Sequence, residues 1–328
     1  MRAFAFEEGR IVEQERPTPD PGPSEALLEV SMAGICATDI ELLGGYYGYR
    51  GIAGHEFVAR VKRAQTAPWL EGQRVVCDIN CGCGTCLRCL NGDPRHCQDR
   101  SVIGIVGHDG CFAEYLLAPT ANLHPVPDTL PDRLAVFTEL LAAALEVGQQ
   151  VHVTGRDRVL VLGDGRLGLL TALGLNLSTP GTILAGHHEA KLALARAQGV
   201  ETFLLGVDGD AAALVRKHGL FDLVVEATGK ADGVVQALDM VRPEGTVVLK
   251  TTTRLPSQLD IAKVVVNEIS LIGSRCGDMA LALNGLSSRR IDVEPLIEAI
   301  WPFARFPEAF DQARRPGALK VLLDYSRI

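Results

Sequence analysis

The feature that most constrains the fold is a glycine-rich turn between an apolar run and a helical segment, RVLVLGDGRLGLLTALGL. Gly163, Gly165 and Gly168 stand in a GxGxxG arrangement. The first glycine permits a tight turn, the second lets a pyrophosphate approach the backbone, and the third lets the helix pack on the strand, while the helix N-terminus attracts the phosphates. The apolar runs TILA, TFLL, DLVVEA and GTVVLK follow. Together they predict a doubly wound parallel sheet, the α/β fold that binds dinucleotides.

One residue that an NAD site normally has is missing. An Asp or Glu should end the second strand and hold the ribose 2′-hydroxyl. Here the chain reads ILAGHHEAK, so Gly186 stands at that end and His187, His188 and Lys191 follow. A small residue leaves room for a 2′-phosphate, with which imidazoles and a lysine could pair, so we predict NADP over NAD. The alternatives are an exposed helical Lys191 and a Glu189 that approaches the ribose.

The fourth strand of this domain ends in EATGK, where the crevice beyond the strand ends would receive the nicotinamide half of the cofactor. The alternative is a plain turn from strand to helix. The predicted cofactor-binding residues are Gly163, Gly165, Leu167, Gly168, Gly186, His187, His188, Lys191 and Thr228.

Length and charge limit the other possibilities. A chain of 328 residues suits two domains, each large enough to bury its own core. A formal charge of -8 without a run of Lys and Arg predicts no nucleic-acid partner. The segment MRAFAFEEGR lacks the apolar stretch of a secretion signal, and no apolar run approaches the roughly 20 residues of a membrane span. We therefore expect a cytoplasmic protein with no membrane partner.

Cysteines gather in the segment CGTCLRCLNGDPRHC, which favours metal over disulfides in a chain without a secretion signal. Two-residue gaps let consecutive thiolates surround one tetrahedral ion, and the longer gap returns a fourth thiolate across a turn. Four sulfurs close the coordination sphere, so we predict a structural zinc, with disulfides or an iron–sulfur cluster as the alternatives. The predicted ligands are Cys83, Cys86, Cys89 and Cys97.

A second candidate metal site lies in the stretch CATDIELLGGYYGYRGIAGHE, which begins at Cys36 and ends with His55 and Glu56. A thiolate, an imidazole and a carboxylate are all zinc ligands, and a catalytic zinc needs only three of them with a fourth position open. Alone, such residues are more often a small buried hydrophobe and a core histidine. The surrounding short apolar runs and proline-rich turns predict a mainly-β lobe.

A helical pattern from Asp132 to Gln150 contains one carboxylate, Glu139, inside its apolar stretch. A carboxylate in that position needs a partner if it is buried. The alternative is a surface position on the helix.

Taken with these motifs, the chain resembles the zinc-containing medium-chain dehydrogenase/reductase family, near its sorbitol, threonine and glucose dehydrogenase branch. The matching segments run in order along nearly the whole chain: GICATD, AGHEFVARV, the CGTCLRC cluster, DGCFAEY, the glycine motif, VVEATG and GSRCG. The resemblance implies a GroES-like, mainly-β catalytic domain formed by residues 1–148 and 278–328. It also implies an inserted Rossmann domain over residues 149–277.

The same resemblance assigns roles to individual residues. Cys36 and His55 match the first two ligands of the catalytic zinc. Glu56 matches the carboxylate that either binds the zinc directly or sits just behind it, and Glu139 matches the remaining protein ligand of the polyol branch. Thr38 matches the hydroxyl that accepts the substrate proton and passes it onward.

The implied activity is that of a zinc-dependent oxidoreductase, which interconverts an alcohol, polyol or sugar and its carbonyl compound by hydride transfer with NAD(P). Two zinc ions per chain, one catalytic and one structural, and a homodimer or homotetramer are expected by the same resemblance. Glu41 stands where many relatives have a histidine, so the outer proton path departs from the family pattern. A zinc-free double-bond reductase of this fold would lack Cys36 and His55; the remaining alternative is a non-catalytic protein that binds zinc or a nucleotide.

Overall fold

The computed structural model describes residues 1–253 and 255–327, which fold as two compact units. Residues 1–139 and 279–328 form the first unit, and residues 140–278 form the second. The first boundary lies inside helix α4 (Thr138–Gln150), earlier than the predicted residue 148. The second boundary, between residues 278 and 279, lies one residue beyond the predicted one.

The first unit is mainly β. Its central sheet has the strand order β10-β6-β5-β3-β18-β17, with β9 also paired to β3, and a smaller sheet has the order β2-β1-β4. Its strands are β1 (Arg2–Glu7), β2 (Arg10–Glu15), β3 (Glu25–Gly34), β4 (Gly51–Ile52), β5 (Glu56–Arg63), β6 (Arg74–Cys77), β7 (Asn80–Cys81), β8 (Ser101–Val102), β9 (Tyr115–Pro119), β10 (Leu123–Pro125), β17 (Ile297–Pro302) and β18 (Lys320–Asp324).

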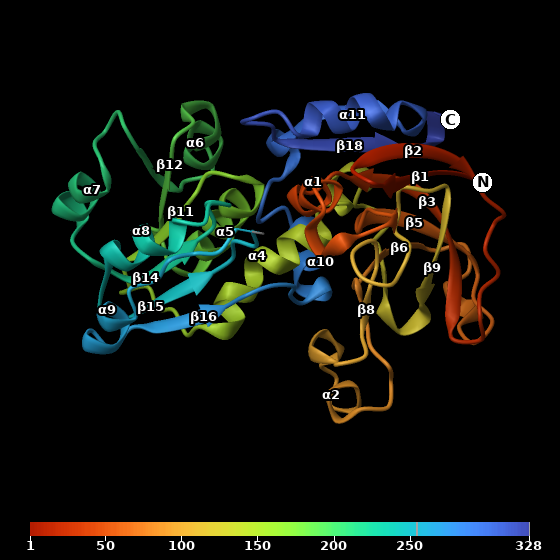
Figure 1. The fold of residues 1–328 in the computed structure, drawn as a ribbon, viewed down its shortest axis with the longest axis horizontal. Coiled ribbons are helices and arrows are strands. Elements are labelled where there is room, and N and C mark those ends of the chain that lie inside the picture. The colour runs from red at the N-terminus through yellow and green to blue at the C-terminus, as the bar shows by residue number, and fades with distance from the viewer. Residues whose placement is uncertain (254, 328) are drawn as a thin grey trace. The chain divides into compact units, whose positions relative to one another are not determined.

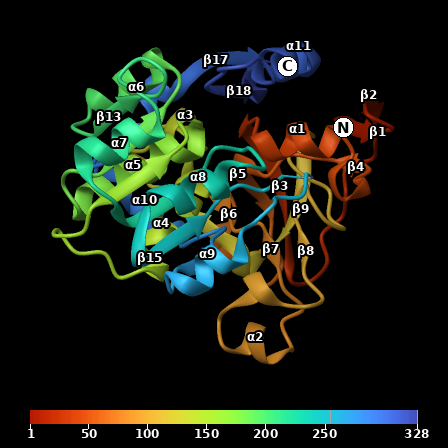
Figure 2. The ribbon, with the colours of Figure 1, turned by 60° about the vertical axis from the view of Figure 1, so that its left-hand side comes forward.

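Few helices belong to this unit. They are α1 (Ala37–Leu43), α2 (Leu87–Leu90), α3 (Asp132–Ala135), α10 (Met279–Ser287) and α11 (Phe306–Ala313), together with the start of α4. The single helix predicted from Asp132 to Gln150 is therefore two helices, α3 and α4, with a break at Val136 and Phe137. The segment that carries α2 projects away from strand β8 in both views (Figure 1, Figure 2).

The second unit contains a parallel six-stranded sheet of order β13-β12-β11-β14-β15-β16, the doubly wound topology that the sequence predicts. Its central strands are buried along their whole length, as expected where helices cover both faces (Figure 1). The strands are β11 (Val159–Leu162), β12 (Ile183–Gly186), β13 (Glu201–Leu204), β14 (Phe221–Glu226), β15 (Val241–Leu249) and β16 (Ser270–Gly273). The helices are α5 (Arg166–Ser178), α6 (Glu189–Arg196), α7 (Ala211–His218), α8 (Gly233–Met240) and α9 (Ile261–Val266), together with the rest of α4.

The two ends of the chain meet in the core of the first unit. Phe4 in β1 lies with its ring centroid 5.2 Å from that of Phe303 and 5.0 Å from that of Phe306, at the start of α11. The ring centroids of Phe112 and Phe306 are 4.5 Å apart, and all four rings are fully buried. Aromatic pairs at these separations add to the stabilisation from buried area, so this cluster joins the C-terminal segment to the N-terminal sheet. Across the described ranges, none of the helices has the length and apolar character needed to cross a bilayer.

We expect Phe306→Ala to destabilise the first unit by about 3–5 kcal/mol, because it removes a ring that contacts buried aromatic residues and leaves a cavity. Both tryptophans, Trp69 and Trp301, lie in this unit, so their fluorescence during urea unfolding reports on it specifically. Val106→Ala, at a side chain that is 42% exposed, is the control and should change stability by less than about 0.5 kcal/mol. Equal changes in the free energy of unfolding for both variants would contradict a stabilising role of the aromatic cluster.

Candidate active site

Three potential zinc ligands from separate positions in the chain come together in the first unit. Cys36 follows β3 and stands at the N-cap of α1, His55 directly precedes β5, and Glu56 is the first residue of β5. Because β3 and β5 are antiparallel and pair Gly34 with Glu56, the end of one strand lies beside the start of the other. All three residues are buried, and their donor atoms lie within 4.8 Å of one another. A soft, a borderline and a hard donor in one buried group fit a zinc ion.

Asp39, in the first turn of α1, holds this group in place. Its Oδ2 accepts a hydrogen bond from the backbone N–H of Cys36 at 2.8 Å, and its Oδ1 lies 3.3 Å from Nδ1 of His55. Burial alone would lower the pKa of His55, but the charges of Asp39 and Cys36 outweigh burial and raise it well above its usual value. With Nδ1 directed at a carboxylate, Nε2 is the ring nitrogen presented to a metal, the usual arrangement of zinc-bound histidine.

Glu56 has a partner from the far end of the chain. Lys320, the first residue of β18, forms an ion pair with Oε2 of Glu56, and both side chains are fully buried. The Lys320 ammonium also lies 6.0 Å from the centroid of the Phe137 ring. A side chain at Gly34 would place its Cβ 2.6 Å from Oε2 of Glu56, so a glycine there leaves room for the pair. Sequence reasoning missed Lys320; its only signal was a lysine at the head of the apolar run KVLLDY.

Glu139 lies in the first turn of α4, and part of the residue is exposed although its carboxyl group is buried. Burial of its carboxyl group raises its pKa to about 7. The positive charges of His55 and Lys320 reduce this rise, and the negative charge of Glu56 adds to it. The carboxyl group therefore shares the electrostatic environment of the zinc-ligand group. Among the described residues, however, Glu139 does not belong to the group of Cys36, His55 and Glu56, whose donor atoms all lie within 4.8 Å of one another.

Thr38, the second residue of α1, stands next to the same group. Its Oγ1 lies 3.8 Å from Sγ of Cys36, and the side chain is only partly buried. A hydroxyl in this position can contact the ligand group on one side and solvent on the other. Glu41 lies one turn further along α1 and is also partly exposed.

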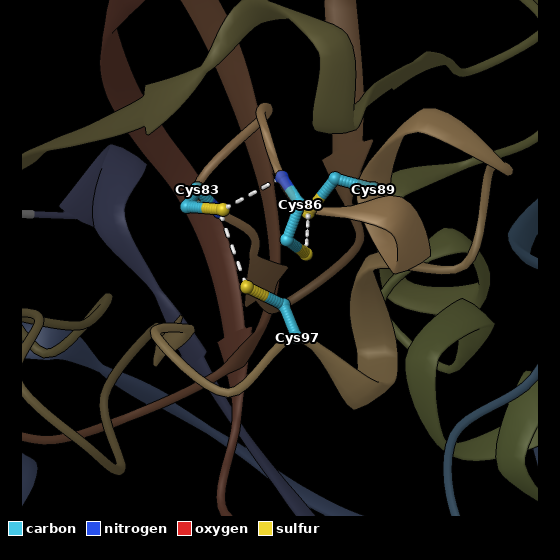
Figure 3. A group of neighbouring side chains, drawn as sticks. All are labelled: Cys83, Cys86, Cys89 and Cys97. Atoms are coloured by element: carbon cyan, nitrogen blue, oxygen red, sulfur yellow. Dashed lines mark hydrogen bonds between the residues drawn. The ribbon is translucent and has the colours of Figure 1, made fainter.

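The side chains of Cys83, Cys86, Cys89 and Cys97 point toward a common centre (Figure 3). Sγ of Cys83 accepts from the backbone N–H of Cys86 at 3.4 Å, Sγ of Cys97 accepts from the N–H of Cys83 at 3.4 Å, and Sγ of Cys86 and Cys89 are 3.6 Å apart. Hydrogen bonds from Thr85 and from the backbone lower the pKa of Cys83 to about 6. None of the nine cysteines, all within the described ranges, forms a disulfide. Four sulfurs at one point fit a closed, structural zinc site.

The glycine motif of the second unit has the geometry of a pyrophosphate site. Gly163 has a φ of +115°, and a Cβ there would lie 2.5 Å from the carbonyl oxygen of Ala227. A Cβ on Gly168 would lie 1.9 Å from the carbonyl oxygen of Gly163, so helix α5 can pack on β11 only with glycine at this position. A Cβ on Gly165, at the N-cap of α5, would have no heavy atom within 4 Å apart from its chain neighbours. The loop therefore leaves space for phosphates beside a helix N-terminus, with Leu167 partly buried in the first turn.

Thr228 sits in a tightly held turn after β14. Its backbone N–H and its hydroxyl both donate to Oε1 of Glu226, at 2.8 and 2.6 Å, and the Thr251 hydroxyl donates to the same oxygen at 2.7 Å. The buried Glu226 carboxylate thus fixes the turn that the sequence assigns to the nicotinamide end of the cofactor.

The end of strand β12 has an acidic neighbour. A Cβ on Gly186 would lie 2.4 Å from Oδ2 of Asp164, so this carboxylate occupies the space that a side chain of residue 186 would take. Lys191 is buried rather than exposed on α6, and Glu189 forms an ion pair with Arg196 at 3.0 Å. The side chain of His188 is 49% exposed, and its Nδ1 lies 3.0 Å from Oδ2 of Asp164.

Sequence reasoning also missed Asp164. Its signal was an acidic residue between the first two glycines of the GxGxxG motif, a position that faces the end of the neighbouring strand.

Two family models match the chain. The alcohol dehydrogenase GroES-like domain matches residues 22–128, and the zinc-binding dehydrogenase domain matches residues 167–288. The D-altritol 5-dehydrogenase of Agrobacterium fabrum is 33% identical over 288 residues, which is 84% of each chain. The sorbitol dehydrogenase of Halalkalibacterium halodurans is 28% identical over 330 residues, which is 96% of each chain.

Solved structures agree with these relatives. The short chain alcohol dehydrogenase rspB of Escherichia coli CFT073, in complex with NADH, superposes with a TM-score of 0.92 at 26% identity and covers 99% of each chain. A zinc-binding dehydrogenase of Sinorhizobium meliloti 1021 bound to NADP superposes with a TM-score of 0.89 at 28% identity and covers 98% of each chain. Both family models, the shared fold and the two groups of potential metal ligands lead to one assignment. This chain belongs to the zinc-containing medium-chain dehydrogenase/reductase family.

Proposed function

We propose that this protein is a zinc-dependent oxidoreductase that interconverts an alcohol, polyol or sugar and its carbonyl compound with NAD(P). The observation that carries this proposal is the buried group of Cys36, His55 and Glu56, which brings a thiolate, an imidazole and a carboxylate together as zinc-binding donor types. Relatives named for D-altritol, sorbitol and L-threonine support a substrate with a hydroxyl-bearing carbon. A panel of polyols, sugars and amino alcohols, followed at the absorbance of the reduced nicotinamide, tests the proposal.

We assign Cys36 and His55 as two ligands of the catalytic zinc, with Glu139 as the third. The buried pairing of Glu56 with Lys320 supports a place for Glu56 just behind the metal, because that carboxylate charge is already offset. Its closeness to Cys36 and His55 supports direct ligation instead, so Glu56 remains the alternative third ligand. Cys83, Cys86, Cys89 and Cys97 are proposed to hold the structural zinc.

The chemistry that a zinc ion supplies in such a site is polarisation of the substrate oxygen, and a nicotinamide supplies the hydride acceptor or donor. Around them, Asp39 keeps the His55 ring in one orientation and Lys320 offsets the charge of Glu56. The Thr38 hydroxyl accepts the proton of the substrate hydroxyl and passes it outward, since its side chain is partly exposed. The next step outward cannot follow the family's histidine, because Glu41 stands in its place.

A non-catalytic protein that binds zinc or a nucleotide is the second candidate. It would need the four-cysteine site or the glycine loop, but not a buried three-ligand group oriented by Asp39. The retention of that group supports the enzyme.

The preference for NADP that the sequence predicts stays a prediction. The exposed side chains of His187 and His188 at the end of β12 are the basis of that prediction, whereas the Asp164 carboxylate, toward which Nδ1 of His188 is directed, favours NAD instead. A higher kcat/KM with NADP than with NAD would uphold it, and an equal or lower value would overturn it.

We also propose a cytoplasmic homodimer or homotetramer without nucleic-acid or membrane partners. Leu87 and Leu90, which are 79% and 69% exposed on α2 beside the cysteine cluster, support a subunit contact there. Light scattering of the zinc-loaded protein tests the assembly; a monomer at micromolar concentration would refute it.

We expect about two zinc ions per chain in the wild type and about one in Glu139→Ala, because the four-cysteine site does not depend on that carboxylate. Atomic emission analysis of the purified proteins measures both. Glu308→Ala removes an acid from the first turn of another helix in the same unit and should keep both ions. If the Glu139→Ala protein is active and still holds two zinc ions, the third ligand is Glu56 instead. If the wild type holds one ion, bound only by the cysteines, the catalytic zinc is refuted.

Replacing Thr38 by valine should lower kcat by about 10²- to 10⁴-fold, because the shape is kept and the proton-accepting hydroxyl is lost. Thr38→Ser should retain most of the activity, and dinucleotide binding should be unchanged in both variants. Steady-state kinetics with the best alcohol of the panel, together with a nucleotide titration, separates these effects. Activity of Thr38→Val within about twofold of the wild type would exclude Thr38 from the proton path.

A further inference from the structure

The Asp164 carboxylate occupies an unusual place in the nucleotide-binding unit. It lies between Gly163 and Gly165 and is only 7% exposed. Its Oδ2 accepts hydrogen bonds from the backbone N–H groups of His187 at 2.8 Å and His188 at 2.7 Å. These two N–H groups follow strand β12 and precede helix α6, so they are donors that an anionic group of a bound nucleotide would otherwise use.

The same carboxylate lies where a side chain of residue 186 would begin. A Cβ on Gly186 would lie 2.4 Å from Cβ, 2.4 Å from Oδ2 and 2.5 Å from Cγ of Asp164. Strands β11 and β12 are parallel neighbours that pair Leu162 with Ala185, so the loop after β11 reaches the end of β12 directly. In dinucleotide-binding folds, the end of this second strand normally carries the acid that holds the ribose hydroxyl. Here a carboxylate occupies that end, but it comes from the glycine loop of the adjacent strand.

We propose that Asp164 supplies the ribose-binding carboxylate that Gly186 lacks, and that it makes the protein select NAD over NADP. This inference rests on the proposed use of a nicotinamide dinucleotide. A carboxylate accepts a hydrogen bond from a ribose hydroxyl, whereas a 2′-phosphate brings about two negative charges against it. The two backbone N–H groups that would bind such a phosphate already bond Asp164.

The basic residues nearby do not reverse this preference. Nδ1 of His188 lies 3.0 Å from Oδ2 of Asp164, so the imidazole is directed at the protein's own carboxylate. Lys191 is buried, with 8% of its surface exposed. His187 has an exposed side chain, but its backbone N–H donates to the Asp164 carboxylate and holds that negative charge beside it.

The decisive experiment moves the acid back to the strand end. Asp164→Gly removes the carboxylate, and the double variant Asp164→Gly with Gly186→Asp places an acid on β12 in the space so vacated. Dissociation constants for NADH and NADPH, from nucleotide fluorescence titration, need no substrate or catalytic zinc. We expect the wild type to favour NADH by about tenfold or more, Asp164→Gly to lose most of that ratio, and the double variant to recover it.

Two further variants guard against an effect on folding. Asp164→Asn keeps the shape and one acceptor oxygen but not the charge, so it should bind NADPH more tightly while changing NADH binding only a few-fold. Asp210→Asn is the matched control, because Asp210 also accepts a backbone N–H at a helix N-terminus of this unit, from Ala213 at 2.7 Å, and its NADH/NADPH ratio should stay at the wild-type value. Thermal unfolding verifies that each variant is folded.

The possible results separate this inference from the proposed function. A wild type that binds NADPH as tightly as NADH, or a ratio unchanged in both Asp164→Gly and Asp164→Asn, would overturn the role of Asp164 and leave the dehydrogenase assignment intact. A folded wild type that binds neither dinucleotide would overturn the proposed function and this inference with it.

Discussion

The antiparallel pairing of β3 with β5 and with β18 is the constraint on which the candidate zinc site depends. It sets the end of β3, which leads to Cys36, beside the start of β5, which carries Glu56. Strand β18 brings Lys320 from the far end of the chain to the same place. A buried ammonium or carboxylate without its partner would cost several kcal/mol, so the pair ties the return of the C-terminal strand to the formation of the site.

Buried carboxylates have a common task in both units, which is to hold a neighbouring group in one position. Asp39 accepts the backbone N–H of Cys36 and faces the His55 ring, and Glu226 accepts two hydrogen bonds from Thr228 in the turn after β14 and one from Thr251, after β15. Asp164 joins the glycine loop to the end of β12 in the same way. Because a desolvated carboxylate is stable only with several donors, each one fixes the geometry of the loop that supplies them.

Several parts of the fold and site were predictable from local spacing. The GxGxxG motif and the apolar runs after it predict the parallel sheet, and the structure has that sheet. The four cysteines were predictable as one cluster because their separations are short, and the structure brings them together. The helix from Asp132 to Gln150 was predicted without its break at Val136 and Phe137, since apolar spacing continues across that break.

The four-cysteine cluster and the glycine loop can be read from the amino-acid order alone, because they follow from residue types at short separations, whereas the roles of Cys36, His55 and Glu139 come from the order of motifs that resembles the family. Long-range contacts cannot be read in this way, and the folded chain alone shows Lys320 against Glu56 and Asp164 in the space beside Gly186. The sequence shows that Gly186 has no side chain, but not which neighbour fills the space that it leaves. That depends on how adjacent strands are aligned, and at the end of β12 this alignment places the Asp164 carboxylate beside Gly186.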